Sequence, residues 1–293
     1  MMSRWFSTGL ALMVSLAIAA CSGGPDSTSA PADPSPPNTV RIQPAERIVA
    51  LTSLTADLVQ TLDGERLVGI TGSPLLQQDD RFAGLTTVSQ GRVEPDLEQI
   101  VALEPDLVVG AAGFHDKTLQ RLGELGVSTL TTEVNSWHDL RSLTETLAAV
   151  TAADPQPILN RYDACLSQAP DDAPDALLLV SRQPLLTPNK ESWAGDFLAQ
   201  FNVRNLAADL QGQSPFGGYV TLSAEKVLEA NPSVLLVVDA GENLLDQLKS
   251  EPFWNDLQAT QNSQVYEFDY FGLINPGSLD SIERACSHLA ELK

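Results

Sequence analysis

Residues 93–110 read VEPDLEQIVALEPDLVVG, and a looser copy of this stretch, TLSAEKVLEANPSVLLVV, occupies residues 221–238. In the first copy, apolar residues recur at helical spacing over residues 96–104, which predicts a short amphipathic helix. Pro105 ends that helix, because the residue before a proline is pushed out of the helical region. The all-apolar run at residues 107–109 then predicts a buried strand. Each copy therefore specifies a helix, a stop and a strand of a parallel sheet.

The two copies align without a gap, with Glu98 on Glu225 and Pro105 on Pro232. Their separation is far longer than the roughly 20 to 50 residues of a solenoid repeat, so the pattern indicates a duplicated lobe. Two like lobes that face one another leave a crevice between them. In open parallel sheets the ligand binds outside the carboxyl ends of the strands. We therefore predict a ligand cleft between the lobes, lined by the loops that follow the strands.

Short β-branched runs alternate with amphipathic segments from Glu46 onward. Further strands are predicted at residues 47–51, 67–70, 127–132, 177–180, 234–238 and 264–268, and helices at 54–62, 117–125, 140–150, 158–167, 196–201, 224–230 and 279–292. The fold class is therefore α/β: two similar α/β lobes with parallel sheets, joined by a helical segment. The N-terminal lobe is expected at residues 45–152, the bridging helix at 153–170 and the C-terminal lobe at 171–293.

Residues 1–20 have the layout of a secretory signal peptide, with a positive charge before the apolar run at residues 10–18. The ending LAIAAC resembles the lipobox of bacterial lipoproteins, in which the cysteine, here Cys21, is lipidated. An ordinary cleaved signal with an incidental cysteine is the alternative. Residues 21–44 are rich in Ser, Pro, Gly and Asp and predict a disordered tether. We expect an exported protein, lipid-anchored at the cell membrane and facing the periplasm or the cell exterior.

The formal net charge of −21 argues against nucleic acid as a partner, because nucleic acid requires a basic face. The hydrolase motifs G-x-S-x-G and H-E-x-x-H do not occur, so we do not expect an enzyme. The histidines are scattered at His115, His138 and His288, so neither a metal site nor a resident cofactor is expected. Cys165 and Cys286 either pair or remain free buried thiols, and the sequence leaves both possibilities open.

Five stretches carry a wider resemblance: RIVALTSLTADLVQTL…RLVGIT, VEPDLEQIVALEPDLVVG, LGELGVSTLTT, YVTLSAEKVLEANPSVLLVV and FWNDLQATQNSQVYEFD. In this order, over nearly all of residues 46–293, they resemble the iron-siderophore, haem and cobalamin substrate-binding proteins of ABC importers. The resemblance implies two lobes held nearly rigid by a single long bridging helix. Residues 154–167 would span only about 20 Å as a helix, which is shorter than this family usually shows.

The same resemblance implies a monomer that captures a chelated iron complex, with a ferric siderophore as the first candidate. The cargo would pass to a dimeric ABC permease with its ATPase, and the lipid anchor would be the only contact with the membrane. Haem and cobalamin are the alternative cargoes within the family. An envelope lipoprotein that senses a ligand or scaffolds a complex without transport is the alternative class.

In this family, a surface glutamate at the start of the repeated helix of each lobe docks on arginine pockets of the permease. Glu98 and Glu225 occupy those two positions. The alternative is that the helix dipole alone favours an acid in a first turn, by about 0.3 to 1 kcal/mol. Two glutamates at matched positions favour the docking interpretation.

Loops after the predicted strands supply candidates for ligand contact. The small residues that begin at Gly110 would let a bulky ligand approach the backbone before Phe114 and His115. His115 is a candidate axial ligand of haem iron or hydrogen-bond donor to a siderophore, with a solvated loop histidine as the alternative. Arg92 and Arg182 suit anionic carboxylate or catecholate groups, with ordinary ion pairing as the alternative.

Aromatic residues in loops or at element starts of the second lobe are candidates to line the cleft. They are Trp193, Phe216, Tyr219, Tyr270 and Phe271. Phe253 and Trp254 lie in a predicted helical turn and are expected to pack inside the lobe. Thr52, Ser53 and Gln90 are candidates for further hydrogen bonds to the ligand.

Overall fold

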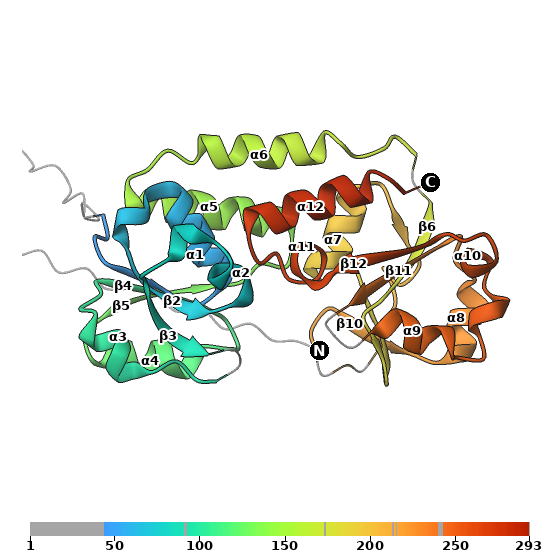
Figure 1. The fold of residues 1–293 in the computed structure, drawn as a ribbon, viewed down its shortest axis with the longest axis horizontal. Coiled ribbons are helices and arrows are strands. Elements are labelled where there is room, and N and C mark those ends of the chain that lie inside the picture. Colours follow the sequence, from blue (N-terminus) through green and yellow to red (C-terminus); the bar gives the residue numbers. More distant parts are fainter. Residues whose placement is uncertain are drawn as a thin grey trace, which may run out of the picture. The chain divides into compact units, whose positions relative to one another are not determined.

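The computed structural model describes residues 44–90, 93–172, 174–212, 214, 216–239 and 243–292. All of them belong to one compact unit, drawn as a ribbon in Figure 1. The proposed signal peptide and Cys21 lie outside the described residues, as does Arg92. In the described ranges, no helix has both the length and the apolar character that crossing a membrane requires.

The first lobe is built on a five-stranded parallel sheet in the order β3-β2-β1-β4-β5. Its strands are β1 (Ile48–Ala50), β2 (Leu67–Gly72), β3 (Thr86–Gln90), β4 (Leu107–Ala111) and β5 (Ser128–Thr132). Its helices are α1 (Ser53–Asp63), α2 (Pro74–Gln77), α3 (Leu97–Ala102), α4 (Asp116–Glu124) and α5 (Trp137–Thr151), with 3-10 turns at Gly64–Arg66 and Asp80–Phe82. The central strand β1 is buried along its whole length, which explains its unbroken apolar sequence.

The second lobe contains a four-stranded parallel sheet in the order β12-β11-β6-β9 and a three-stranded antiparallel sheet in the order β10-β8-β7. Its strands are β6 (Asp175–Leu179), β7 (Ser181–Arg182), β8 (Leu185–Pro188), β9 (Arg204–Asn205), β10 (Tyr219–Leu222), β11 (Val234–Asp239) and β12 (Val265–Asp269). The helices that come after the first lobe in the sequence are α6 (Gln156–Leu166), α7 (Trp193–Gln200), α8 (Ala224–Ala230), α9 (Leu244–Lys249), α10 (Gln258–Gln261), α11 (Tyr270–Leu273) and α12 (Leu279–Leu289), with a 3-10 turn at Trp254–Asp256. The predicted α/β class with parallel sheets is confirmed, and the antiparallel sheet is an addition that the sequence did not reveal.

The repeated stretch forms equivalent units, α3–β4 in the first lobe and α8–β11 in the second. Their N-caps are also equivalent: the Asp96 carboxylate accepts from the first-turn amides of α3, and the Ser223 hydroxyl from the Lys226 N–H. In each unit, the residue directly before the proline that follows the helix has a positive φ: 47° at Glu104 and 38° at Asn231. The left-handed conformation stops each helix, so the chain turns into its strand at the same point in both lobes.

Helix α6 is fastened to helices α5 and α12. Cys165 and Cys286 form a disulfide between α6 and α12, which resolves the choice that the sequence left open. On the adjacent turn of α6, Arg161 pairs with Asp280 and Glu283 of α12, with N–O distances of 2.6 Å for each pair. The 11 residues of α6 span about 16 Å at 1.5 Å per residue, against the span of about 20 Å expected for residues 154–167.

The two lobes also share buried contacts and one continuous apolar core. The N–H of Leu279, the first residue of α12, donates to Asp57 Oδ2 of α1 at 2.7 Å. In the reciprocal direction, the N–H of Trp137, the first residue of α5, donates to Asp196 Oδ2 of α7 at 2.7 Å. An acid from each lobe therefore caps a helix whose N-terminus meets that lobe.

Candidate functional site: the carboxyl edges of the two parallel sheets

Several predicted ligand-binding residues follow strands directly at the carboxyl edges of the parallel sheets. In the first lobe the strand order reverses between β1 and β4, so the loops after these two strands diverge. Thr52 and Ser53 come after β1, and Phe114 and His115 come after β4. A strand-order reversal of this kind is where open α/β sheets hold ligands. The topology therefore brings both pairs to the edge where a ligand site is expected.

The second lobe gathers its loop aromatics into two pairs. Phe216 meets Tyr219 edge-on with ring centroids 6.4 Å apart, and Tyr270 meets Phe271 edge-on at 5.3 Å. Burial is the main cause that raises the pKa of the Tyr219 hydroxyl, and the nearby Tyr270 raises it further. Phe216 keeps 57% of its surface exposed. Such a group can stack on the faces of a large organic ligand.

Phe271 also lies at the junction of the two lobes. A Cβ placed on Gly277 would lie 2.7 Å from Phe271 Cδ1 and 2.9 Å from Leu75 Cδ1 of α2. Gly277 has a φ of 62°, in the region that favours glycine. The glycine therefore lets the Phe271 ring and the first lobe approach the same stretch of backbone.

The structure corrects the prediction for Trp193. Only 4% of this residue is exposed, and its indole N–H donates to the Gly272 carbonyl at 2.8 Å. Its ring stacks on Trp137 with centroids 5.6 Å apart. The Ser192 hydroxyl caps α7 and makes Trp193 the first helical residue, earlier than the sequence indicated. Trp193 therefore belongs to the aromatic core and not to an open cleft wall.

His115 is held against its own loop. The Ala111 N–H donates to His115 Nδ1 at 3.0 Å, so Nε2 carries the proton of the neutral ring. Burial lowers the pKa of His115, with an opposing contribution from Asp116, so the ring is neutral at pH 7. A side chain at Gly110 would lie 2.9 Å from the His115 Cβ, so this glycine accommodates the histidine, where we had expected it to admit a ligand. His115 can donate a hydrogen bond, but its Nδ1 lone pair is already used.

The polar candidates differ in whether their side chains already have partners within the protein. Arg182 forms an ion pair with Glu251, which is the alternative that the sequence had left open for it. The Thr52 hydroxyl caps α1 by accepting from the Thr55 N–H at 3.2 Å, and Ser53 is 8% exposed. Gln90 is exposed at the end of β3. Phe253 is 1% exposed, which confirms that it packs inside the lobe.

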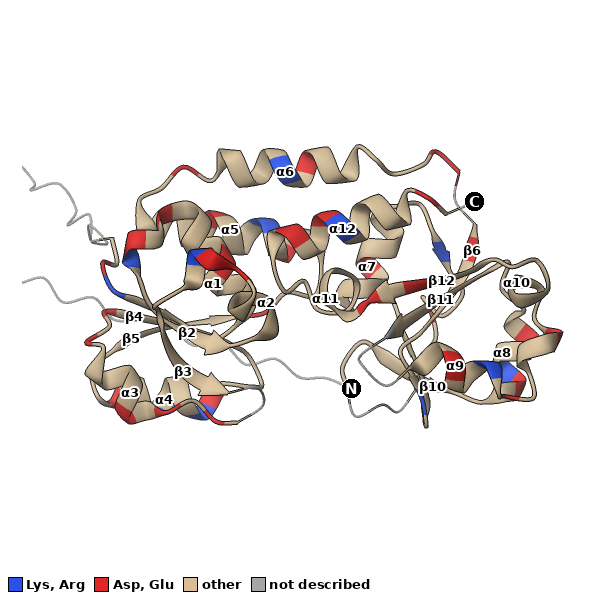
Figure 2. Ribbon diagram, in the orientation of Figure 1, with Lys and Arg blue, Asp and Glu red and all other residues tan. Residues whose placement is uncertain are grey.

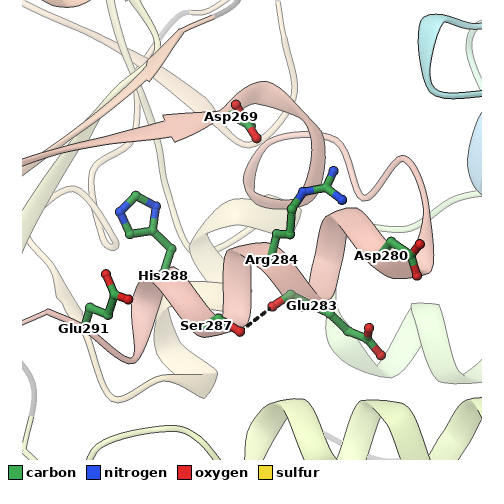
Figure 3. Close-up of a pocket in the computed structure, with 7 residues that line it drawn as sticks. All are labelled: Asp269, Asp280, Glu283, Arg284, Ser287, His288 and Glu291. Carbon is green, nitrogen blue, oxygen red and sulfur yellow. Dashed lines mark hydrogen bonds between the residues drawn. The ribbon is translucent and has the colours of Figure 1, made fainter. Parts of the chain in front are cut away.

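A separate hollow of about 520 Å³ lies along α12 (Figure 3). Its lining residues are Asp269, Asp280, Glu283, Arg284, Ser287, His288 and Glu291. None of them belongs to the predicted ligand set, and the surplus of carboxylates opposes an anionic ligand. The His288 ring stacks on Phe268 with centroids 4.1 Å apart, so it serves packing. Across the described residues, no group of three or more His, Cys, Asp or Glu is placed to hold a metal ion.

The two predicted docking glutamates take equivalent positions. Glu98 and Glu225 are each the second residue of their helix, α3 and α8, and both are exposed. In the part of the chain that the structure describes, neither carboxylate has an ion-pair partner. Figure 2 shows acidic positions on both helices, and in Figure 1 both helices lie at the lower edge, away from α6 at the upper edge.

Sequence reasoning missed the two acids that join the lobes. Asp57 lies in SLTADL and Asp196 in SWAGDF, so each follows a serine by four residues in a largely apolar helix. An acid among apolar residues of a predicted helix indicates that a hydrogen-bond or ion-pair partner lies next to it in the core. The partner amide that completes this signal is far away in sequence, because Leu279 lies 222 positions after Asp57.

The fold and this edge define an α/β binding protein with two parallel sheets, whose candidate ligand residues follow the strands. Comparison with known proteins places it further: residues 48–270 match the family model described as periplasmic binding protein. The chain therefore belongs to the periplasmic binding protein family.

Relatives in this family are similar over most of their length. The chain is 26% identical to the vitamin B12-binding protein of Salmonella typhimurium over 67% of this chain and 74% of that protein. It is 24% identical to the Fe(3+)-citrate-binding protein YfmC of Bacillus subtilis over 76% of this chain and 73% of that protein. The crystal structure of an ABC transporter substrate-binding protein from Listeria monocytogenes superposes with a TM-score of 0.70 at 21% identity, covering 85% of this chain and 98% of that one.

Proposed function

We propose that this protein is the substrate-binding component of an ABC importer, anchored through Cys21, and that it hands its cargo to a permease of two like subunits. The observation that carries the proposal is the matched pair Glu98 and Glu225 on α3 and α8. Dipole stabilisation acts on each helix separately and needs no match between lobes. Two exposed acids at equivalent positions suit a partner with two equivalent basic pockets.

The cargo in this proposal is a chelated iron complex, with a ferric siderophore first. A relative named for Fe(3+)-citrate binding supports this cargo class. The aromatic group of Tyr219, Tyr270, Phe216 and Phe271 supplies faces for a large organic chelate, and His115 supplies a hydrogen-bond donor.

Cobalamin is the second candidate cargo, because the aromatic group remains available while Arg182 is already neutralised by Glu251. A relative named for vitamin B12 binding supports this choice. Haem is the weaker candidate, because an axial iron ligand needs a free lone pair and the Nδ1 lone pair of His115 already accepts a backbone hydrogen bond. Tyr270 would then be the remaining candidate ligand for haem iron.

Calorimetric titration with ferric siderophores, ferric citrate, haem and cobalamin tests the capture step. We expect one of these classes to bind at micromolar concentration or tighter, and Tyr270→Ala to weaken binding roughly tenfold by removing an aromatic ring that would contact the ligand. The control Tyr266→Phe removes only the hydroxyl that donates to Gln264 and should bind like the parent protein. If none of the four classes binds, the chelated-metal cargo is wrong.

A further inference from the structure

Two large apolar side chains exposed to solvent fall at matched positions of the repeat. Among the residues that the structure describes, the exposed large apolar residues are Val93, Val101, Phe114, Leu125, Leu210, Phe216 and Leu228. Two of them, Val101 on α3 and Leu228 on α8, occupy the same place in the two copies, three residues after Glu98 and Glu225. Val101 is 42% exposed and Leu228 is 38% exposed.

Each apolar side chain shares a helix face with its glutamate. Residues three apart on a helix are neighbours, with Cβ atoms about 5–6 Å apart. The opposite face of each helix is buried through Ile100 in α3 and Val227 in α8, both 0% exposed. In both lobes, one side of the helix is therefore packed against the core, and the exposed side carries an acid next to an apolar side chain.

We infer that the permease recognises an acid together with an apolar side chain on each lobe: a first docking patch of Glu98 and Val101 and a second docking patch of Glu225 and Leu228. This inference rests on the proposed transport function. The partner it fits has two equivalent pockets, each with a basic group beside an apolar surface. The acids guide encounter and orientation, whereas the apolar side chains slow dissociation once water has left the contact.

The rest of each patch differs between the lobes. Lys226 pairs with Glu229 at 2.6 Å beside the second patch, and its equivalent in the first copy is the uncharged Gln99. The features that recur are therefore the glutamate and the exposed apolar residue, and the charge of the neighbouring side chain does not recur.

Binding kinetics on the cognate permease–ATPase complex, reconstituted in nanodiscs, test the inference. We expect the double variant Val101→Ser/Leu228→Ser to dissociate roughly tenfold faster with unchanged salt dependence. The double variant Glu98→Gln/Glu225→Gln should instead associate more slowly and lose most of its salt dependence. Leu125→Ser, at a residue 64% exposed and outside both patches, is the matched control and should behave like the parent protein.

The outcomes separate the two proposals. If the glutamine variant is weakened while the serine variant binds like the parent protein, docking stands and the apolar part of each patch is wrong. An equal loss in Leu125→Ser also contradicts it, because the effect is then not confined to the patches. If neither double variant changes binding, both the docking proposal and this inference are wrong. Unchanged cargo affinity in every variant verifies that the fold is intact.

Discussion

Asp57 is a carboxylate that joins the lobes through one side chain. It is 1% exposed, accepts from the Leu279 N–H and pairs with Arg81 at 2.8 Å. A buried acid is tolerated only where such partners compensate for its lost hydration. Asp57 therefore ties α1 of the first lobe to the start of α12 in the second.

Replacing Asp57 should destabilise the whole fold. In Asp57→Ala the Leu279 amide loses its acceptor and Arg81 loses one of its two acidic partners, so we expect about 3 kcal/mol less free energy of unfolding in urea. Asp163→Ala, which removes the exposed partner of Arg141, is the control and should change stability by less than about 1 kcal/mol. A loss at Asp57 no greater than at Asp163 would contradict its joining role.

The same residue gives a pH dependence with a definite sign. Burial, the largest cause, raises the pKa of Asp57 above its ordinary value of 3.8 despite the Leu279 amide and Arg81. Between 3.8 and the raised pKa, the folded protein holds a proton that the unfolded chain has released. This contribution to stability is therefore lost as pH rises through that window. Asp57→Asn should remove it, so the stability of the parent protein relative to this variant should fall with rising pH in acidic urea titrations.

Helix α6 is attached to α12 and α5 by a disulfide, ion pairs and a hydrogen bond. Arg161 and Cys165 face α12, while Tyr162 donates to or accepts from Thr144 of α5 at 2.9 Å. Arg141 of α5 pairs with Asp163 at 2.7 Å. A short helix is thus attached to one helix from each lobe, which limits how far the lobes can separate.

The disulfide of α6 should contribute measurably to stability. We expect Cys165→Ser/Cys286→Ser to unfold with about 2–4 kcal/mol less free energy, since the unfolded chain loses its cross-link. Adding reductant should lower the stability of the parent protein by a similar amount and leave the double variant unchanged. If reductant has no effect on the parent protein, the disulfide does not stabilise the fold.

The sequence predicted those elements whose signals are local. The unit α3–β4 and its copy α8–β11 have an N-cap, an apolar face, a proline stop and an apolar strand, and all of these appear in the structure. Strand β8 was missed because its four residues are all buried and end in Pro188, so no alternation marks it. Helix α7 begins at Trp193, before the predicted start at Asp196, because Ser192 caps it. Trp193 is therefore a buried helical residue, where the sequence had predicted a loop.

The sequence predicted which loops carry the candidate residues, but not which of their side chains are free. His115 and Tyr270 were expected in loops after strands, and they come after β4 and β12. Whether a side chain is free depends on contacts between distant segments, such as the ion pair of Arg182 with Glu251 or the hydrogen bond of the Trp193 indole to the Gly272 carbonyl. Such contacts leave no mark in the local sequence, because each partner alone is an ordinary residue.

Across the whole molecule, the contacts between lobes favour rigidity over hinge opening. One apolar core is continuous through both lobes, and the Asp57 and Asp196 caps cross between them in opposite directions. Interfaces between domains allow motion by default unless they are large and apolar. A nearly rigid body would present both docking patches at a fixed spacing, as a permease of two like subunits requires.

Delivery of cargo through Glu98 and Glu225 is tested by uptake of the bound cargo into cells that carry Glu98→Lys/Glu225→Lys. Both acids are exposed and lie outside the ligand edge, so cargo affinity of the purified variant should equal that of the parent protein. We expect uptake to fall to near background, because a lysine would then face each basic pocket and repel it. Normal uptake with normal cargo binding would contradict delivery through these glutamates and would favour an envelope sensor or scaffold.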